Sequence, residues 1–166
     1  FIDKNRDLYL TNVRTIGLQR KINKLGSNIS SFVWNDAYNM LAAIADSRFT
    51  IWYYPSIVYV DKNLLTRSIY LRDASEFGKS PALISFLGNN VTMRTSDGSV
   101  IHTTVPPYAS VLLAYISSNK WDDALKLCRF VKETSLWAIL AGAAVYGKDL
   151  DTASYAYAAL NEVLVL

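Results

Sequence analysis

The sequence has a single cysteine, Cys128, and a single histidine, His102, among its 166 residues. One cysteine cannot form an intramolecular disulfide, and one Cys with one His cannot fill the tetrahedral site of a zinc ion. Cys128 lies between Leu127 and Arg129 in a helical pattern, where a lone cysteine is more often a small buried apolar side chain than a nucleophile. We therefore expect no disulfide, no bound metal and no other cofactor.

The sequence also lacks long apolar runs and clusters of like charge. The longest weakly polar run, Leu136 to Tyr146, is about half of the roughly 20 residues that a membrane-spanning helix needs. Lys and Arg number 17 against 14 Asp and Glu, and these charges are interspersed. The densest basic stretch, Arg14 to Lys24, lacks ordered stacking aromatics, so we expect it to be a solvated loop. The sequence thus predicts neither membrane insertion nor nucleic-acid binding.

Motifs that carry catalysis are absent too. The chain has no Gly-rich phosphate loop, no Gly-x-Ser-x-Gly and no dinucleotide-binding fingerprint. His102 lies in an alternating, strand-like run, and the nearby Asp97 and Ser99 are explained by a turn. Asp122 and Asp123 are adjacent, so they point in different directions on a helix. A catalytic site needs several reactive side chains that lie close enough to act together. We therefore predict that the protein is not an enzyme, and we assign no catalytic, cofactor-binding or metal-binding residue.

What the chain does contain is an abrupt change of hydrophobic period at Pro106-Pro107. Before it, short aromatic and β-branched runs alternate with turn residues, which is typical of strands. From Trp121 onward the chain is rich in Ala and Leu at helical spacing. We expect the change from strand to helix between Val105 and Ala114, because proline donates no ladder hydrogen bond and disfavours helix before it.

Seven segments before the prolines have the pattern of strands, and an eighth has that of a hairpin. The predicted strands are Asp7–Val13, Ile29–Asp36, Met40–Asp46, Arg48–Tyr54, Ser56–Asp61, Arg67–Asp73 and Ala82–Asn90, and the hairpin is Asn90–Val105. Short connections make these strands an antiparallel meander, and Asp97-Gly98 is a strong hairpin signal. The order of a Trp-Asn-Asp strand, an Ala-rich strand and an aromatic strand is that of one propeller blade, because small residues suit the crowded inner strands.

Aromatic residues make up 13% of the chain, and four of them cluster between Trp52 and Tyr59. We favour blade-to-blade packing as their role, with Trp52 and Tyr54 on one side of a sheet and Tyr53 on the other. A partner surface is the alternative, because Tyr and Trp are favoured interface anchors.

The helical part contains a weak repeat of 29 residues, which aligns Asp122 with Asp151 and Ala124 with Ala153. This period is near that of helix-pair repeats. Within the first helix, Trp121, Leu125 and Cys128 form one stripe. We expect this stripe to pack against the following helix around Trp137 and Leu140.

Several blocks resemble a known family closely and in order along nearly the whole chain. These blocks are FIDKNRDLYLT (1–11), RFTIWYYPSIVYVDKNLL (48–65), RDASEFGKSP (72–81), SDGSVIH (96–102) and SSNKWDDALKLCRFVKETSLWA (117–138). They resemble the family of the eighty-kilodalton WD-repeat subunit of intraflagellar transport complex B. The Trp-Asp dipeptide of WD repeats is itself absent, and Ile51-Trp52-Tyr53 stands where we expect it.

The resemblance implies a mixed fold in which residues 1–105 are closing blades of a WD-repeat β-propeller and residues 106–166 begin a TPR-like α-solenoid. It further implies a segment of a longer, non-catalytic scaffold or adaptor subunit for cilium assembly, found at the cilium, the ciliary base and in the cytoplasm. The expected partners are other complex B subunits, including one with a calponin-homology domain, and a homodimer is left open. No residue is assigned to a partner contact. The alternative is a vesicle-coat or tethering scaffold, because coat proteins share this order of domains.

Overall fold

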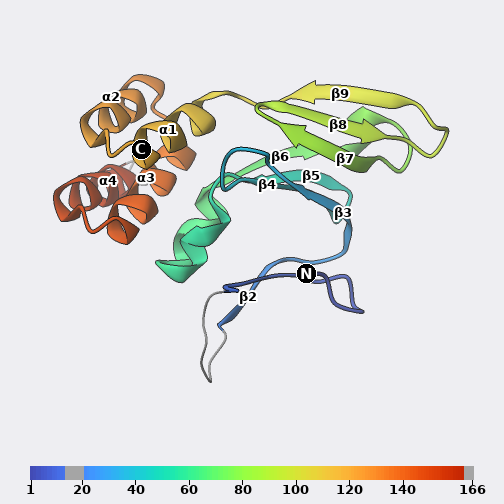
Figure 1. Ribbon diagram of the computed structural model, residues 1–166, viewed down its shortest axis with the longest axis horizontal. Helices are drawn as coiled ribbons and strands as arrows, with labels where there is room; N and C mark the ends of the chain where they lie inside the picture. The colour runs from blue at the N-terminus through green and yellow to red at the C-terminus, as the bar shows by residue number, and fades with distance from the viewer. Residues whose placement is uncertain (14–20, 163–166) are drawn as a thin grey trace.

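The computed structural model describes residues 1–13 and 21–162. Within these ranges every strand precedes every α-helix, and the helices gather at one end of the molecule (Figure 1). The strands are β1 (Leu8–Thr11), β2 (Ile22–Gly26), β3 (Ile29–Trp34), β4 (Leu41–Ala45), β5 (Arg48–Trp52), β6 (Ile69–Asp73), β7 (Ala82–Leu87), β8 (Asn90–Arg94) and β9 (Val100–Thr104). The α-helices are α1 (Tyr108–Ser117), α2 (Trp121–Val131), α3 (Thr134–Tyr146) and α4 (Leu150–Glu162), and the short 3₁₀ helices are η1 (Pro55–Tyr59), η2 (Lys62–Arg67) and η3 (Ala74–Phe77). The predicted fold class, antiparallel sheets followed by helices, is confirmed.

The strands form three antiparallel sheets, β1-β2, β3-β4-β5-β6 and β7-β8-β9. Tight turns set their register. Asp46 and Ser47 join β4 to β5 with φ of +48° and +61°, as a two-residue hairpin turn requires. Asp97 Oδ1 accepts a 2.9 Å hydrogen bond from the Ser99 N–H in the predicted turn between β8 and β9, where Gly98 has φ of +89°.

The middle sheet, β3 to β6, is covered on both faces. One face belongs to a cluster made of Leu8, Ile29, Leu41, Ala43 and Trp52. The other face, which includes Phe49 and Ile51, belongs to a larger cluster that continues through β7–β9 into the helices. Because side chains of a strand alternate between faces, two covered faces explain why the Ala-rich β4 is buried from Leu41 to Ile44.

The predicted strand at Ser56–Asp61 is wrong, because the chain forms η1 there and then leads into η2. Pro55 stands at the start of η1, where its fixed φ suits a helical turn and its missing N–H costs nothing. Asp61 then caps η2 by accepting a 2.9 Å hydrogen bond from the N–H two residues on. Ile and Val favour strands, but Ile57 and Val58 are adjacent and both buried, which an alternating strand with one exposed face does not allow.

The basic stretch Arg14 to Lys24 lies partly outside the described residues, and its end is not the predicted loop. Residues from Ile22 onward form β2, which pairs with β1. Lys24 Nζ lies 2.6 Å from Asp7 Oδ2. Their hydrogen bond lowers the pKa of Asp7 and raises the pKa of Lys24, so this lysine is paired within the fold.

One prediction about the aromatic cluster also fails. Trp52 and Tyr53 belong to different clusters, as their predicted opposite orientations require. Tyr54 does not share the side of Trp52, because β5 ends at Trp52 and Tyr54 packs against the larger cluster.

The helices begin at Tyr108, four residues after β9 ends at Thr104, within the predicted interval. The 29-residue repeat is visible in their backbone. Asn119 and Lys148 follow α1 and α3 with φ of +55° and +62°, and they stand 29 residues apart. The next N–H groups, those of Lys120 and Asp149, each donate a 2.9 Å hydrogen bond to the carbonyl five residues back. The same turn therefore ends both helices.

Candidate partner-binding scaffold

Local structure explains the side chains that could take part in a reaction. His102 is exposed on β9, and its Nδ1 lies 3.1 Å from the hydroxyl of Thr92. Cys128 is fully buried, and burial raises the pKa of its thiol to about 12. Hydrogen bonds from Thr95 and Ser99 lower the pKa of Asp97 to about 2, which fits a carboxylate that shapes a turn.

Asp122 and Asp123 both lie in the first turn of α2, where carboxylates interact favourably with the helix dipole. Asp123 Oδ1 lies 3.6 Å from Lys126 Nζ on the exposed surface. Among residues 1–13 and 21–162, no three His, Cys, Asp or Glu side chains are grouped so that they could hold a metal ion. In the same ranges, no helix combines the length and the apolarity needed to cross a membrane.

A close contact joins the segment between β5 and β6 to the α-helices. Ile57 of η1 is fully buried against α3 at Gly142. A Cβ at position 142 would lie 2.5 Å from Ile57 Cγ1 and 2.8 Å from Cδ1, far closer than apolar carbons approach. The absence of a side chain at Gly142 is therefore what allows this contact.

A polar contact joins the same two parts of the chain. The Tyr157 hydroxyl of α4 donates a 3.0 Å hydrogen bond to Asp61 Oδ2, just before η2. Burial and the neighbouring carboxylate together raise the pKa of Tyr157 to about 12. Asp61 thus both caps η2 through Oδ1 and contacts α4 through Oδ2.

A third contact fixes the start of α1. The Ser110 hydroxyl lies 2.9 Å from Asn89 Oδ1, in the turn between β7 and β8, and 2.8 Å from the Pro107 carbonyl. The Val105 N–H also donates a 2.8 Å hydrogen bond to the Asn89 carbonyl. We call the three contacts, Ile57–Gly142, Asp61–Tyr157 and Asn89–Ser110, the joint.

The joint makes strands and helices share one hydrophobic core, since the larger cluster runs from Phe49 through Ile57 to Leu160 without interruption. The sequence pattern does not reveal the joint, because it predicts a strand where η1 lies. One signal was present: Gly142 interrupts an Ala-rich helix, where glycine costs about 1 kcal/mol relative to alanine and so suggests a close approach.

The predicted stripe on α2 is only partly buried. Trp121 and Leu125 are half-buried and Cys128 is buried. The Trp121 ring lies against the end of α3, where its Cζ2 would be 3.0 Å from a Cβ at Gly147. The centroid of the Trp137 ring lies 6.2 Å from that of the Tyr155 ring in α4.

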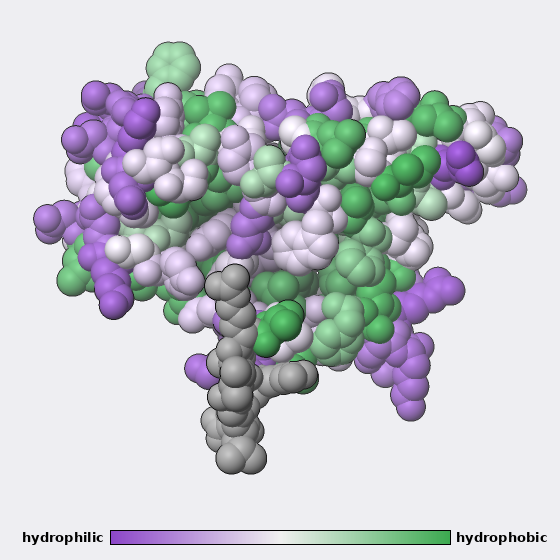
Figure 2. All heavy atoms as spheres, in the orientation of Figure 1, coloured by the Kyte–Doolittle hydropathy of each residue, from purple (hydrophilic) through white to green (hydrophobic). Residues whose placement is uncertain are grey.

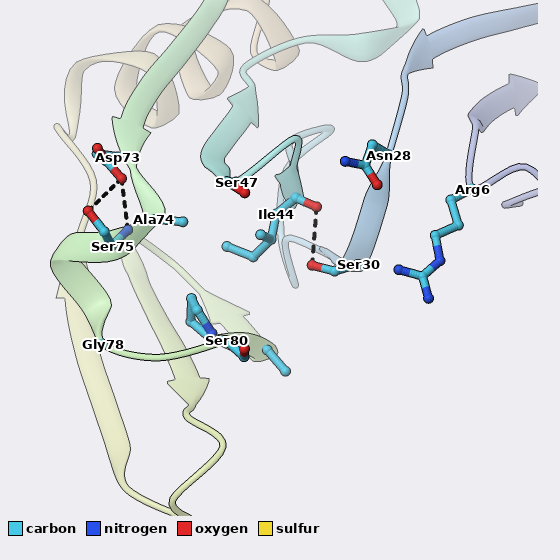
Figure 3. Close-up of a pocket in the computed structure, with 12 residues that line it drawn as sticks. Arg6, Asn28, Ser30, Ile44, Ser47, Asp73, Ala74, Ser75, Gly78 and Ser80 are labelled. Carbon is cyan, nitrogen blue, oxygen red and sulfur yellow. Dashed lines mark hydrogen bonds between the residues drawn. The ribbon is translucent and has the colours of Figure 1, made fainter.

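Among the hollows on the strand part of the surface, two differ in their chemistry. The larger, about 500 Å³, is lined by both polar and apolar residues and lies where the turns of neighbouring sheets meet. Figure 3 shows Arg6 at one side of it and Asp73 at the other. Hydrogen bonds from Ser75 lower the pKa of Asp73, so this hollow presents charges of both signs beside apolar surface.

The smaller hollow, about 250 Å³, is apolar and lies between the N-terminal residues and β3. Phe1, Phe32 and Trp34 line it and are 56%, 37% and 44% exposed. Figure 2 shows apolar surface gathered around the N-terminal strands. These two hollows and the helix surfaces are the candidate binding surfaces.

Small antiparallel sheets that pack face to face, followed by antiparallel helices with a repeated turn, define a β-propeller segment joined to a helix-pair repeat. Comparison with known families agrees. Residues 1–108 match the family model described as the IFT80 second beta-propeller, and residues 136–165 match the IFT80/172/WDR35/WDR19 TPR domain.

The chain belongs to the family of intraflagellar transport protein 80. It is 52% identical over 163 residues to the protein named Intraflagellar transport protein 80 homolog from Rattus norvegicus, and 51% identical to that from Mus musculus. Each alignment covers 98% of this chain and 21% of the relative. The chain thus spans about a fifth of the length of these curated relatives.

Proposed function

We propose that this chain is part of a non-catalytic scaffold or adaptor subunit of intraflagellar transport complex B. In this role its propeller and solenoid surfaces hold other subunits during cilium assembly. The observation that carries the proposal is the joint, because it holds two kinds of binding surface in a fixed relation. A scaffold needs this property, whereas an enzyme needs grouped reactive side chains.

The partners that we propose are other complex B subunits, including one with a calponin-homology domain. Family membership supports this proposal. The exposed aromatic residues around the apolar hollow and the charges around the larger hollow supply two surfaces of different chemistry, which suits the binding of more than one partner. We propose that the parent protein works at the cilium, the ciliary base and in the cytoplasm, without nucleic acid and without insertion into a membrane. A homodimer is compatible with the same surfaces.

Affinity purification of the tagged parent protein from ciliated cells, followed by quantitative mass spectrometry, tests the proposal. We expect complex B subunits to be enriched. A vesicle-coat or tethering scaffold would have the same order of propeller and helix pairs, so enrichment of coat subunits without complex B subunits would contradict the proposal. A matched purification of the Gly142→Leu variant shows whether enrichment depends on the joint.

A further inference from the structure

Ser80 and Pro81 form the only Ser-Pro or Thr-Pro pair in the sequence. They lie in the loop between η3 and β7, and both line the larger hollow (Figure 3). Proline-directed protein kinases phosphorylate a serine or threonine that is followed directly by proline, because their substrate groove accepts a proline at that position. The pair therefore has the sequence that one definite class of modifying enzyme recognises.

The Ser80 hydroxyl is free to react. The side chain is exposed, and its hydroxyl forms no hydrogen bond with any residue that the structure describes. Ser75 lines the same hollow, but its hydroxyl donates a 2.7 Å hydrogen bond to Asp73 Oδ1. A kinase must bring the hydroxyl oxygen in line with the γ-phosphate of ATP, and at Ser80 no internal hydrogen bond opposes this. The hollow, about 500 Å³ in volume, leaves room for the added phosphate.

The backbone of the loop favours a change to the extended form that kinases bind. Ser80 has φ of +49°, which is uncommon for a residue other than glycine, and a residue before proline prefers an extended conformation. Extending the loop at Ser80 therefore relieves strain. One backbone hydrogen bond ties the loop to the turn between β8 and β9, since the Ser96 N–H donates a 3.0 Å hydrogen bond to the Lys79 carbonyl. The loop can thus open without disturbing the strands beside it.

A phosphate on Ser80 would change the charge of the larger hollow. Arg6 and Asp73 are the charged residues that line it, so their charges balance. A phosphoserine carries about 1.5 to 2 negative charges at pH 7. Phosphorylation would therefore make the hollow net negative, and the change would occur on one of the candidate binding surfaces.

We propose that Ser80 is a phosphorylation site for a proline-directed protein kinase, with ATP as the phosphoryl donor. The Ser80 hydroxyl oxygen forms a bond to the γ-phosphorus, the bond from that phosphorus to the β,γ-bridging oxygen breaks, and ADP leaves. The hydroxyl proton passes to the catalytic aspartate of the kinase. This proposal goes beyond the proposed function and does not depend on it, because it rests on the loop and the hollow alone.

Phosphorylation of the purified full-length parent protein tests the proposal. The protein is incubated with Mg-ATP and, in turn, a cyclin-dependent and a mitogen-activated protein kinase, and phosphate is located by mass spectrometry. We expect phosphate on Ser80 and none on Ser75, the matched exposed serine that no proline follows. Pro81→Ala keeps the hydroxyl and should slow the reaction at least about tenfold, the discrimination typical of an apolar pocket that loses its substrate group. Equal rates with and without Pro81, or equal modification of Ser75, would overturn the proposal.

Two further measurements separate the sequence from the folded loop and from the cell. A synthetic peptide of residues 74–86 should be phosphorylated by the same kinases, and modification of the peptide without modification of the folded protein would overturn the proposal, since the loop would then be closed to the enzyme. In parent protein purified from ciliated cells with phosphatase inhibitors, we expect the phosphorylated Ser80 peptide, and we expect its amount to fall when proline-directed kinases are inhibited. Its absence, when the unmodified peptide is detected, would also overturn the proposal.

Discussion

Adding one methyl group at Gly142 tests the joint directly. In the native background, the new Cβ would lie 2.5 Å from Ile57 Cγ1. Overpacking of this kind costs about 1–3 kcal/mol. Against this cost, alanine is favoured over glycine within a helix by about 1 kcal/mol. We therefore expect Gly142→Ala to lower the free energy of unfolding by about 1 kcal/mol.

The same substitution should raise the free energy of unfolding, and not lower it, when Ile57 is shortened. In an Ile57→Ala background the nearest remaining atom is the Cβ of residue 57, at 3.7 Å, which is ordinary van der Waals contact. Gly142→Ala should then stabilise the protein by about 1 kcal/mol, because only the helix preference remains. The expected coupling between the two positions is about 2 kcal/mol.

Hydrogen exchange of the α3 amides in the parent protein measures this coupling, because it reports local opening in a large protein. Val91→Ala, in the fully buried core of β8, is the matched background, since it creates a cavity without relieving the contact at Ile57. If Gly142→Ala has the same effect in all three backgrounds, the joint is not packed as described.

Three further predictions concern single side chains. Trp121→Ala should loosen the first helix pair by about 2 kcal/mol, less than the roughly 3–5 kcal/mol for a fully buried tryptophan; unchanged hydrogen exchange across residues 121–146 would show that Trp121 contributes no packing. Tyr157 has a pKa raised to about 12, so its stabilisation is complete below pH of about 10 and is lost as the pH rises toward 12. Melting temperatures of Tyr157→Phe should therefore fall less steeply over this interval than those of the native protein, and equal slopes would refute the role of the Asp61 contact. His102→Ala should leave biological activity intact, and loss of activity at unchanged thermal stability would favour an enzyme.

The parts of the fold that depend on local pattern could be predicted from the sequence. Asp46-Ser47 and Asp97-Gly98 specify tight turns, and the strands beside them follow by alternation. The turns after α1 and α3 follow from the 29-residue repeat. Each of these features is encoded within a few residues of where it appears.

The joint could not be predicted, because it depends on residues far apart in the sequence. Ile57 reads as part of a strand, and only its contact with Gly142 shows why a helical turn is buried there. The contact between Asp61 and Tyr157 likewise leaves no local signal. The division of the chain at residue 105 into two domains stays a prediction, since the two family matches end at 108 and begin at 136.

We propose that this chain acts through its fixed shape and not through a reactive group. Restoration of cilia in cells that lack the parent protein tests it most directly, with the fraction of ciliated cells measured at matched protein abundance. We expect His102→Ala to restore cilia as well as the native protein does, and Gly142→Leu, which disrupts the joint, not to restore them. Full restoration by Gly142→Leu together with failure of His102→Ala would contradict it.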